Sequence, residues 1–355
     1  MKVAIVHDDL VQWGGAERVL EAICEVFPEA PIYTSVFDNK NSEISERFKN
    51  KKIHLSFLQK IPGWKNLYKA LLPLYPLAFE QFDFSEYDLV ISHTTRFAKS
   101  IITKPGTIHI SYCHTPPRFL WHLSEEKFPA ILANYLGFLR LYDGITSKRV
   151  DYFLAGSLNA KARIKKIYNK KSNVLYPFVD IKRFENQEPF NGGYYLVVSR
   201  LNKYKRVDLA INACGQLRKN LKIIGIGPEM ENLKKLIRSY SGIELIGNLD
   251  DESVVNVLSG CKGLIVSGVE DFGMTPLEAQ ALGKPVIALR SGGALETVNE
   301  NTGVFFEKQN IEELKIAIMK LESKRIDPEK CKENAQFFRK EKFLSSLKQN
   351  VAQLL

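Results

Sequence analysis

Two carboxylates, Glu270 and Glu278, flank the start of a predicted helix, and their spacing suggests ligand chemistry. An apolar run at residues 264–266 predicts a short buried strand before them. Pro276 directly after Thr275 predicts a helix that starts at Thr275. A helix start presents unpaired backbone N–H groups and the positive end of the helix dipole, which attract phosphate. Because carboxylates beside it can accept hydrogen bonds from sugar hydroxyls, the unit suits a nucleotide sugar.

Glu278 also has a purely structural explanation. Thr275 followed three residues later by Glu278 is the pattern of a capping box, in which the Glu stabilises the helix start. This explanation leaves Glu270 and the intervening Gly273 without a role. Local stabilisation and ligand binding both stay open for Glu278.

Basic and glycine-rich segments follow other predicted strands. Arg200 and Lys205 lie five residues apart after the run 195–199, and together they can clamp a diphosphate, although an exposed basic loop is the alternative. Gly227 belongs to a Gly-x-Gly turn after the next strand, which by itself is weak evidence. Gly15 opens a helix after the first strand, so its backbone N–H can face a phosphate or simply start the helix.

A further motif, Tyr-Cys-His-Thr-Pro-Pro-Arg-Phe-Leu-Trp, occupies residues 112–121. The Pro pair holds His114 rigidly at the end of a predicted strand, although a lone His is more often structural. Asp8 and Asp9 follow the first strand, but no third ligand accompanies them. We therefore expect no metal site there.

Apolar runs alternate with helical patterns along the whole chain, which predicts an α/β fold with parallel sheets. A turn-rich segment at 176–193 is the best domain boundary, and residues 333–355 read as one helix. Ligands of parallel sheets bind beyond the carboxyl ends of the strands, where all the motifs above are expected. The predicted strands cover residues 3–6, 32–34, 89–92, 107–112, 152–155, 195–199, 221–225, 243–246, 264–267, 285–288 and 303–306.

Composition limits the classes of protein. A chain of 355 residues suits two domains, and its five scattered Cys argue against a disulfide framework or a zinc site. The chain enters a strand directly after Met-Lys, and no apolar run approaches the ~18 residues that span a bilayer, so we expect a cytoplasmic protein. The net charge of +10 favours an anionic partner such as nucleic acid, a membrane face or a phosphorylated substrate.

The motifs resemble those of a known family. Glu-x7-Glu with Gly273 and Pro276 resembles the donor-site signature of retaining GT-B glycosyltransferases of family four. The Arg–Lys spacing and the sequence Gly-x-Gly-Pro-Glu at 225–229 are similar to further motifs of that family. Residues 112–121 resemble the branch of bacterial O-antigen and polysaccharide mannosyltransferases, except that Phe119 stands where many relatives have Tyr.

The resemblance implies a fold and a set of site residues. The fold is GT-B: two Rossmann-like domains face each other across a cleft, and the last helix crosses back to the first domain. The implied domains are 1–180 with the returning helix 338–355, for the acceptor, and 181–337, for the nucleotide sugar. The implied catalytic residues are His114, Glu270, Arg200 and Lys205, and the implied acceptor contacts are Arg118 and Trp121. The implied donor contacts are Gly15, Arg200, Lys205, Gly227, Asn248, Glu270, Phe272, Gly273, Met274, Thr275 and Glu278.

The resemblance also implies an activity. The enzyme would move a hexose, mannose from GDP-mannose, to a sugar hydroxyl of a lipid-linked glycan in cell-surface polysaccharide biosynthesis, with retention and without metal or cofactor. A UDP-sugar-dependent transferase or a GT-B sugar-nucleotide epimerase is the alternative. A dinucleotide oxidoreductase would need Gly-x-Gly-x-x-Gly after the first strand, which is missing. Nucleic-acid binding would explain the charge but not the Glu-x7-Glu loop, so we expect no nucleic-acid partner.

An aromatic and basic stretch between residues 57 and 84 contains Trp64, Lys65, Tyr68 and Lys69. Such a stretch suits an anionic membrane surface, which would place the protein peripherally at the inner face of the cell membrane. A buried helix pair of the first domain is an equally good explanation.

Overall fold

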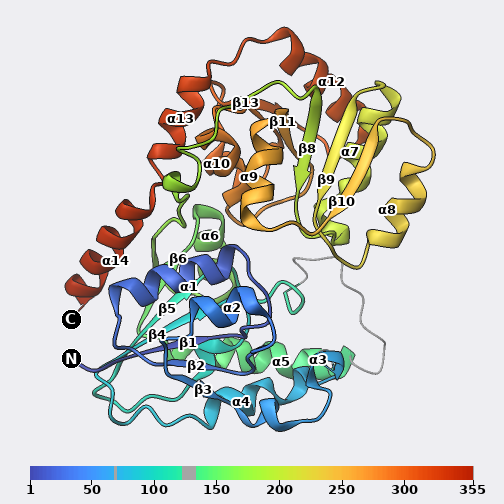
Figure 1. The fold of residues 1–355 in the computed structure, drawn as a ribbon. Helices are drawn as coiled ribbons and strands as arrows, with labels where there is room; N and C mark the ends of the chain where they lie inside the picture. The colour runs from blue at the N-terminus through green and yellow to red at the C-terminus, as the bar shows by residue number, and fades with distance from the viewer. Residues whose placement is uncertain (68–69, 122–132, 355) are drawn as a thin grey trace. The chain divides into compact units, whose positions relative to one another are not determined.

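The computed structural model describes residues 1–67, 70–121 and 133–354 (Figure 1). They form two compact units, which we call unit 1 (Met1–Tyr176 with Phe343–Leu355) and unit 2 (Pro177–Lys342). Both units are parallel sheets combined with helices, so the predicted fold class is confirmed. Unit 1 ends four residues before the predicted boundary at residue 180, and the C-terminal segment joins it at Phe343 rather than at residue 338.

The sheet of unit 1 has seven parallel strands in the order β3-β2-β1-β4-β5-β6-β7. Its central strands β1, β4 and β5 are buried along almost their whole length, as expected for strands covered on both faces. The sequence did not predict β3 and β7, the two edge strands, which have only three residues each and are partly exposed. The strands are β1 (Val3–His7), β2 (Ile32–Thr34), β3 (Ile53–Leu55), β4 (Leu89–Thr94), β5 (Ile108–Cys113), β6 (Tyr152–Ala155) and β7 (Ser172–Val174).

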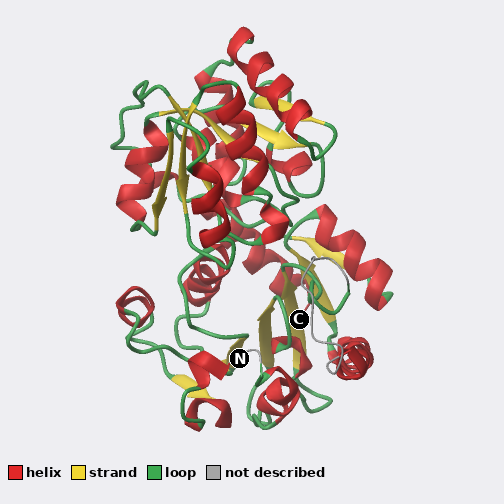
Figure 2. Ribbon diagram, turned by 90° about the vertical axis from the view of Figure 1, so that its right-hand side faces the viewer, coloured by secondary structure: helices red, strands yellow, loops and turns green. Residues whose placement is uncertain are grey.

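Helices cover this sheet on both faces (Figures 1 and 2). One core cluster joins β1 and β4 to α4 and α5, and another joins β5 and β6 to α6. The ring of Phe343, in the C-terminal helix, packs edge-on against Tyr112 at 6.1 Å between centroids. The α-helices are α1 (Gly15–Val26), α2 (Ser42–Arg47), α3 (Trp64–Leu67), α4 (Tyr75–Glu80), α5 (Ala133–Thr146), α6 (Leu158–Tyr168) and α14 (Lys340–Leu354).

Most of the aromatic stretch 57–84 belongs to the core of unit 1. Tyr75, Phe79 and Phe84 are buried, and Trp64 packs partly against them. Leu67 and Leu77 are exceptions, with 43% and 57% of their surfaces exposed. Tyr68 and Lys69 lie outside the described residues. The core interpretation therefore accounts for most of the described part of this stretch.

The sheet of unit 2 has six parallel strands in the order β10-β9-β8-β11-β12-β13. The largest apolar cluster lies between this sheet and α7, α8 and α12, whereas α10 packs with α11 and α13 (Figure 1). The strands are β8 (Tyr194–Val198), β9 (Asn220–Ile224), β10 (Ile243–Gly247), β11 (Cys261–Val266), β12 (Val286–Leu289) and β13 (Gly303–Phe306). The helices are α7 (Val207–Gln216), α8 (Met230–Ile237), α9 (Asp251–Ser259), α10 (Met274–Ala281), α11 (Ala294–Thr297), α12 (Ile311–Ser323) and α13 (Pro328–Gln336).

The predicted helix at 333–355 is interrupted, because the chain leaves the helical conformation between α13 and α14. There the carbonyl of Phe338 accepts a hydrogen bond from the backbone N–H of Val179 (2.8 Å), and Arg339 forms a bridge with the same residue. The ring of Phe338 packs at 5.6 Å from that of Phe272. These tertiary contacts replace the helical hydrogen bonds that the local pattern predicted.

Candidate active site

In unit 2, the basic loop after β8 contacts the acidic loop after β11. The Nζ atom of Lys205 lies 2.5 and 2.6 Å from the two carboxylate oxygens of Glu270. Both side chains are largely buried, at 14% and 19% exposure. The structure therefore joins two predicted site residues that are 65 positions apart in the sequence.

Glycines allow these loops to approach closely. A Cβ atom on Gly268 would lie 2.6 Å from the Cα atom of Lys205, and one on Gly293 would lie 2.3 Å from that of Phe272. The N–H of Gly293 donates to the carbonyl of Glu270 at 2.9 Å. Sequence reasoning missed Gly293, although the pair Gly292-Gly293 shortly after the predicted strand 285–288 was an available signal.

The N-terminus of α10 differs from the prediction. The helix begins at Met274, after Gly273 with a φ of +95°, and no side chain caps it. Thr275 therefore lies within the first turn, and the structure does not form the capping box with Glu278 that was the alternative to ligand binding. Gly273 makes this start possible, because a positive φ is costly for other residues. The backbone N–H groups of the first turn are left without a side-chain cap, as an anion site requires.

Glu278 is instead held by Arg183, which ends a short 3-10 helix (Ile181–Arg183). The Nη1 atom of Arg183 donates to the Glu278 carboxylate at 3.2 Å, and its Nη2 atom lies 3.5 Å from Asp251. Arg183 was not predicted as a site residue. A single basic residue in a turn-rich segment gives no signal in the sequence, since only the tertiary fold brings it to α10.

The remaining predicted donor residues lie on neighbouring loops. A Cβ atom on Gly227 would lie 2.6 Å from the carbonyl oxygen of Leu201, so this glycine lets the loop after β9 pack on the loop after β8. Arg200 and Asn248 are exposed on the loops that follow β8 and β10. A ligand can therefore reach both side chains.

In unit 1, three histidines form a row across β1, β4 and the end of β5. Nδ1 of His7 lies 2.9 Å from Nδ1 of His93, and Nε2 of His93 lies 2.7 Å from Nε2 of His114. His7 and His93 are buried, whereas His114 is half-buried. Glu17 in the first turn of α1 lies 3.9 Å from Nε2 of His7. The structure thus connects His114 to two histidines that the sequence analysis did not select.

The pair Asp8 and Asp9 has a structural role. The carboxylate of Asp8 accepts hydrogen bonds from four successive backbone N–H groups of residues 95–98. Asp9 pairs with Arg96. Although burial opposes it, Arg96, His7 and the backbone donors lower the pKa of Asp8, whereas burial raises the pKa of Asp9. Among the described residues, no group of three or more His, Cys, Asp or Glu could hold a metal ion.

The other predicted residues of unit 1 lie near the same sheet edge. Gly15 is the first residue of α1, whose N-terminus has no side-chain cap. Arg118 is half-buried. The indole N–H of Trp121 donates to Asp143 at 2.7 Å, and Asp143 also pairs with the buried Lys99. Trp121 can therefore offer only its ring to a ligand.

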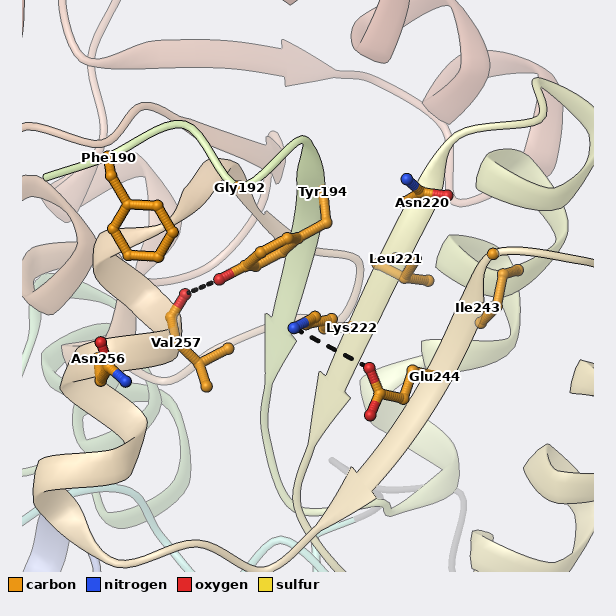
Figure 3. A pocket seen from close by; sticks show the side chains of 11 residues that line it. Phe190, Gly192, Tyr194, Asn220, Leu221, Lys222, Ile243, Glu244, Asn256 and Val257 are labelled. Carbon is orange, nitrogen blue, oxygen red and sulfur yellow. Dashed lines mark hydrogen bonds and ion pairs between the residues drawn. The ribbon is translucent and has the colours of Figure 1, made fainter.

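A cavity of about 560 Å³ lies at the edge of the unit 2 sheet where the strands β8, β9 and β10 begin (Figure 3). Tyr194, Asn220 and Ile243, the first residues of β8, β9 and β10, line it. Lys222 there places its Nζ 4.4 Å from the centre of the Tyr194 ring. Because the Lys205–Glu270 pair follows the carboxyl ends of the strands, this cavity is separate from the predicted donor site.

Two Rossmann-like units with donor-type loops at the carboxyl edge define a GT-B glycosyltransferase. Residues 178–337 match the family model "Glycosyl transferases group 1", and residues 13–183 match the model "Glycosyltransferase Family 4". The chain belongs to the family-four glycosyltransferases and is an enzyme of that class.

Individual relatives and a solved structure are also similar to this chain. The chain is 31% identical over 175 residues to an uncharacterized glycosyltransferase of Methanocaldococcus jannaschii, a match that covers 48% of this chain and 49% of that protein. It thus spans about half the length of that relative. It is 25% identical over 357 residues to the alpha-1,3/1,6-mannosyltransferase ALG2 of Mus musculus, covering 86% and 84% of the two chains. HepE of Anabaena in complex with UDP-glucose superimposes with a TM-score of 0.72 at 16% identity, covering 99% and 100% of the two chains, which shows the shared fold.

Proposed function

We propose that this glycosyltransferase moves mannose from GDP-mannose to a sugar hydroxyl of a lipid-linked glycan in cell-surface polysaccharide biosynthesis, with retention of configuration. The observation that carries the proposal is the Lys205–Glu270 pair beside the N-terminus of α10. The choice of mannose rests on the mannosyltransferase relative and on the resemblance of residues 112–121 to O-antigen enzymes.

The donor roles follow from charge and position. Arg200 and Lys205 meet the diphosphate together with the backbone of residues 272–275 and of Gly15. Glu278, oriented by Arg183, accepts hydrogen bonds from the ribose hydroxyls. The loops at Gly227 and Asn248 contact the nucleotide, Glu270 and His114 contact the sugar, and Arg118 with the Trp121 ring lines the acceptor side.

The reaction needs stabilisation of the leaving diphosphate. Arg200, Lys205 and the N–H groups at the start of α10 supply positive charge for this purpose, so we propose a metal-independent reaction. A donor phosphate oxygen takes the proton of the acceptor hydroxyl while that hydroxyl attacks from the same face. Transfer should therefore continue in EDTA, and loss of activity restored by a divalent cation would contradict this mechanism.

We also propose peripheral binding to an anionic membrane face. Phe138, Leu141 and Ile145 are spaced as one face of α5 and are 55%, 63% and 50% exposed. Leu77 is nearby on α4, since Tyr142 of α5 donates to Glu80 of α4 at 3.0 Å. This apolar surface and the net charge of +10 supply the two contributions that peripheral attachment needs. No helix of the described residues is long and apolar enough to cross a membrane.

Two experiments test these proposals. GDP, UDP, ADP and dTDP are compared by thermal shift, followed by transfer assays with the matching sugars; GDP and mannose should give the largest responses. Preference for a uridine donor, or turnover of a UDP-sugar without acceptor, would replace the proposal by one of its alternatives.

Membrane binding is measured by sedimentation with phosphatidylglycerol vesicles. The triple variant Phe138→Ser, Leu141→Ser, Ile145→Ser should lose binding, whereas Ile316→Ser with Met319→Ser on the exposed face of α12 should keep it. Equal binding by both variants would contradict the assignment of this surface.

A further inference from the structure

The histidine row of unit 1 runs across neighbouring strands of the sheet. His7 is the register partner of His93 between β1 and β4, and His93 is the partner of Tyr112 between β4 and β5. His114 follows the end of β5 directly. Adjacent strands therefore place three imidazoles side by side, and their rings are 5.0 Å and 4.6 Å apart between centroids.

The two nitrogen–nitrogen contacts restrict where protons can be. A contact of 2.7–2.9 Å between two imidazole nitrogens is a hydrogen bond that holds one proton. Three neutral imidazoles carry three protons, of which the two contacts hold two. One proton is left for the two ends of the row, which are Nε2 of His7 and Nδ1 of His114. The protonation of one end thus determines that of the other.

We propose that Glu17, acting through His7 and His93, sets the protonation state of His114. The negative charge of the Glu17 carboxylate, 3.9 Å away, favours the remaining proton on Nε2 of His7. His93 then donates from Nδ1 to His7, and His114 donates from Nε2 to His93. This leaves the lone pair of His114 on Nδ1, so His114 is a hydrogen-bond acceptor at the edge of the sheet where the proposed function places the donor sugar.

The row can also take up charge. A proton that arrives at Nδ1 of His114 moves the Nε2 proton of His114 to His93 and the Nδ1 proton of His93 to His7. The result is neutral His114, neutral His93 and an imidazolium at His7, beside the Glu17 carboxylate. No proton is created or lost, and the positive charge moves from the half-buried end to the buried carboxylate.

The surroundings favour this distribution. Burial and the neighbouring His114 and His7 hold the pKa of His93 well below its ordinary value, so that His93 stays neutral. At His7, burial opposes the charged form, but Glu17, followed by Asp8 and Asp9, raises the pKa above its ordinary value. Asp8 is occupied by backbone N–H groups and Asp9 by Arg96, so Glu17 is the main source of this effect. Glu17, His7 and His93 are positioning residues.

The test is histidine ¹⁵N NMR of the full chain without substrate. Six histidines make the spectrum tractable, and single His→Gln variants assign it. At about pH 9, where the row is neutral, His114 should carry its proton on Nε2 and His93 on Nδ1. On acidification, all three should change with one common midpoint, because the row titrates as a unit.

The variants separate the row from general packing effects. Glu17→Gln should lower the common midpoint by at least about one pH unit, since an anion beside the row stabilises its charged form. Glu21→Gln, one turn further along α1 and paired with Arg47, should leave it unchanged. His93→Phe should uncouple His114 from His7. If Glu17→Gln fails to fold, the parent tautomers and the His93→Phe variant still decide.

A proton on Nδ1 of His114 at high pH, or three independent midpoints, would overturn the proposal. The inference relies on the proposed function only for the identity of the ligand that His114 contacts. The spectra need no substrate, so they test the histidine row independently of the transfer reaction. A transfer rate whose acidic limb ignores the row midpoint would instead contradict the catalytic role of His114.

Discussion

Replacing Glu270 with Gln should strengthen the binding of a nucleoside diphosphate while it weakens sugar transfer. Both carboxylate oxygens of Glu270 engage Lys205, at 2.5 and 2.6 Å. A diphosphate must share Lys205 with this carboxylate and is also repelled by it. Gln keeps an acceptor oxygen of similar reach but removes the negative charge, so more of the Lys205 charge becomes available to the phosphates.

The size of the effect follows from Coulomb's law. Two negative charges roughly 6 Å apart repel by about 0.7 kcal/mol in water and about 2.8 kcal/mol at an effective dielectric constant of about 20. The two side chains are 14% and 19% exposed, which places the site between these limits. We therefore expect a gain of about 1 to 2 kcal/mol, or roughly 5- to 30-fold in affinity. Lys205→Ala should lose about 1.5 to 3 kcal/mol, as for a charged hydrogen bond.

Isothermal titration with GDP and guanosine provides the measurement. Guanosine has no phosphates, so the parent, Glu270→Gln and Lys205→Ala should bind it equally. Transfer by Glu270→Gln should still fall, because the proposed contact with the sugar is weakened. If Glu270→Gln binds GDP less tightly than the parent, or if both variants change guanosine binding equally, the Lys205–Glu270 pair is only a structural contact.

Three further predictions concern stability. Arg183→Ala and Glu278→Ala should each lower the free energy of unfolding in urea by about 1 to 2 kcal/mol, and a double-mutant cycle should give about 1 kcal/mol of coupling; additive losses would contradict the pairing. Asp8→Asn should lose about 2 to 4 kcal/mol at pH 7. The native pKa of Asp8 is lowered, so its contribution to the free energy of unfolding is present above the unfolded pKa of about 3.9 and is lost as pH falls through the native pKa. The Asn variant should therefore lose less stability on acidification than the parent. Equal losses would refute this. Lys99→Met, which leaves Asp143 buried without its cation, should cost about 3 to 5 kcal/mol by thermal or urea unfolding, and a loss below about 1 kcal/mol would argue against a buried ion pair.

The sequence predicted the central strands well because they are covered on both faces. Such strands contain apolar runs that can be recognised, and the inner strands β2 and β6 have the predicted limits. The edge strands β3 and β7 escaped prediction, because three partly exposed residues leave no hydrophobic run to recognise. Their place in the sheet comes from pairing with a neighbouring strand, which a local pattern does not contain.

Local sequence patterns and tertiary contacts gave different views of the candidate site. The motifs selected Lys205 and Glu270, which the structure brings into contact, but local reasoning gave Glu278 the alternative of a capping box. The structure replaces that contact with Arg183, 95 residues away. His7 and His93 read as isolated residues of buried strands, 86 positions apart, and only the register of β1 with β4 unites them. Contacts between neighbouring parallel strands give no recognisable spacing of residues in the sequence.

In both units a charged or ionisable group of the candidate site lies beside an internal counter-charge. In unit 2 the Lys205 cation is neutralised by Glu270, and in unit 1 the histidine row ends on Glu17. An unpaired charge at such partly buried sites would carry a large desolvation cost, so an internal counter-charge stabilises the fold. A diphosphate that binds beside Lys205 shares the cation with Glu270, so it gains only part of the ionic contact. A neutral sugar gains no ionic contact there, so the Lys205 cation still favours phosphorylated donors over free sugars.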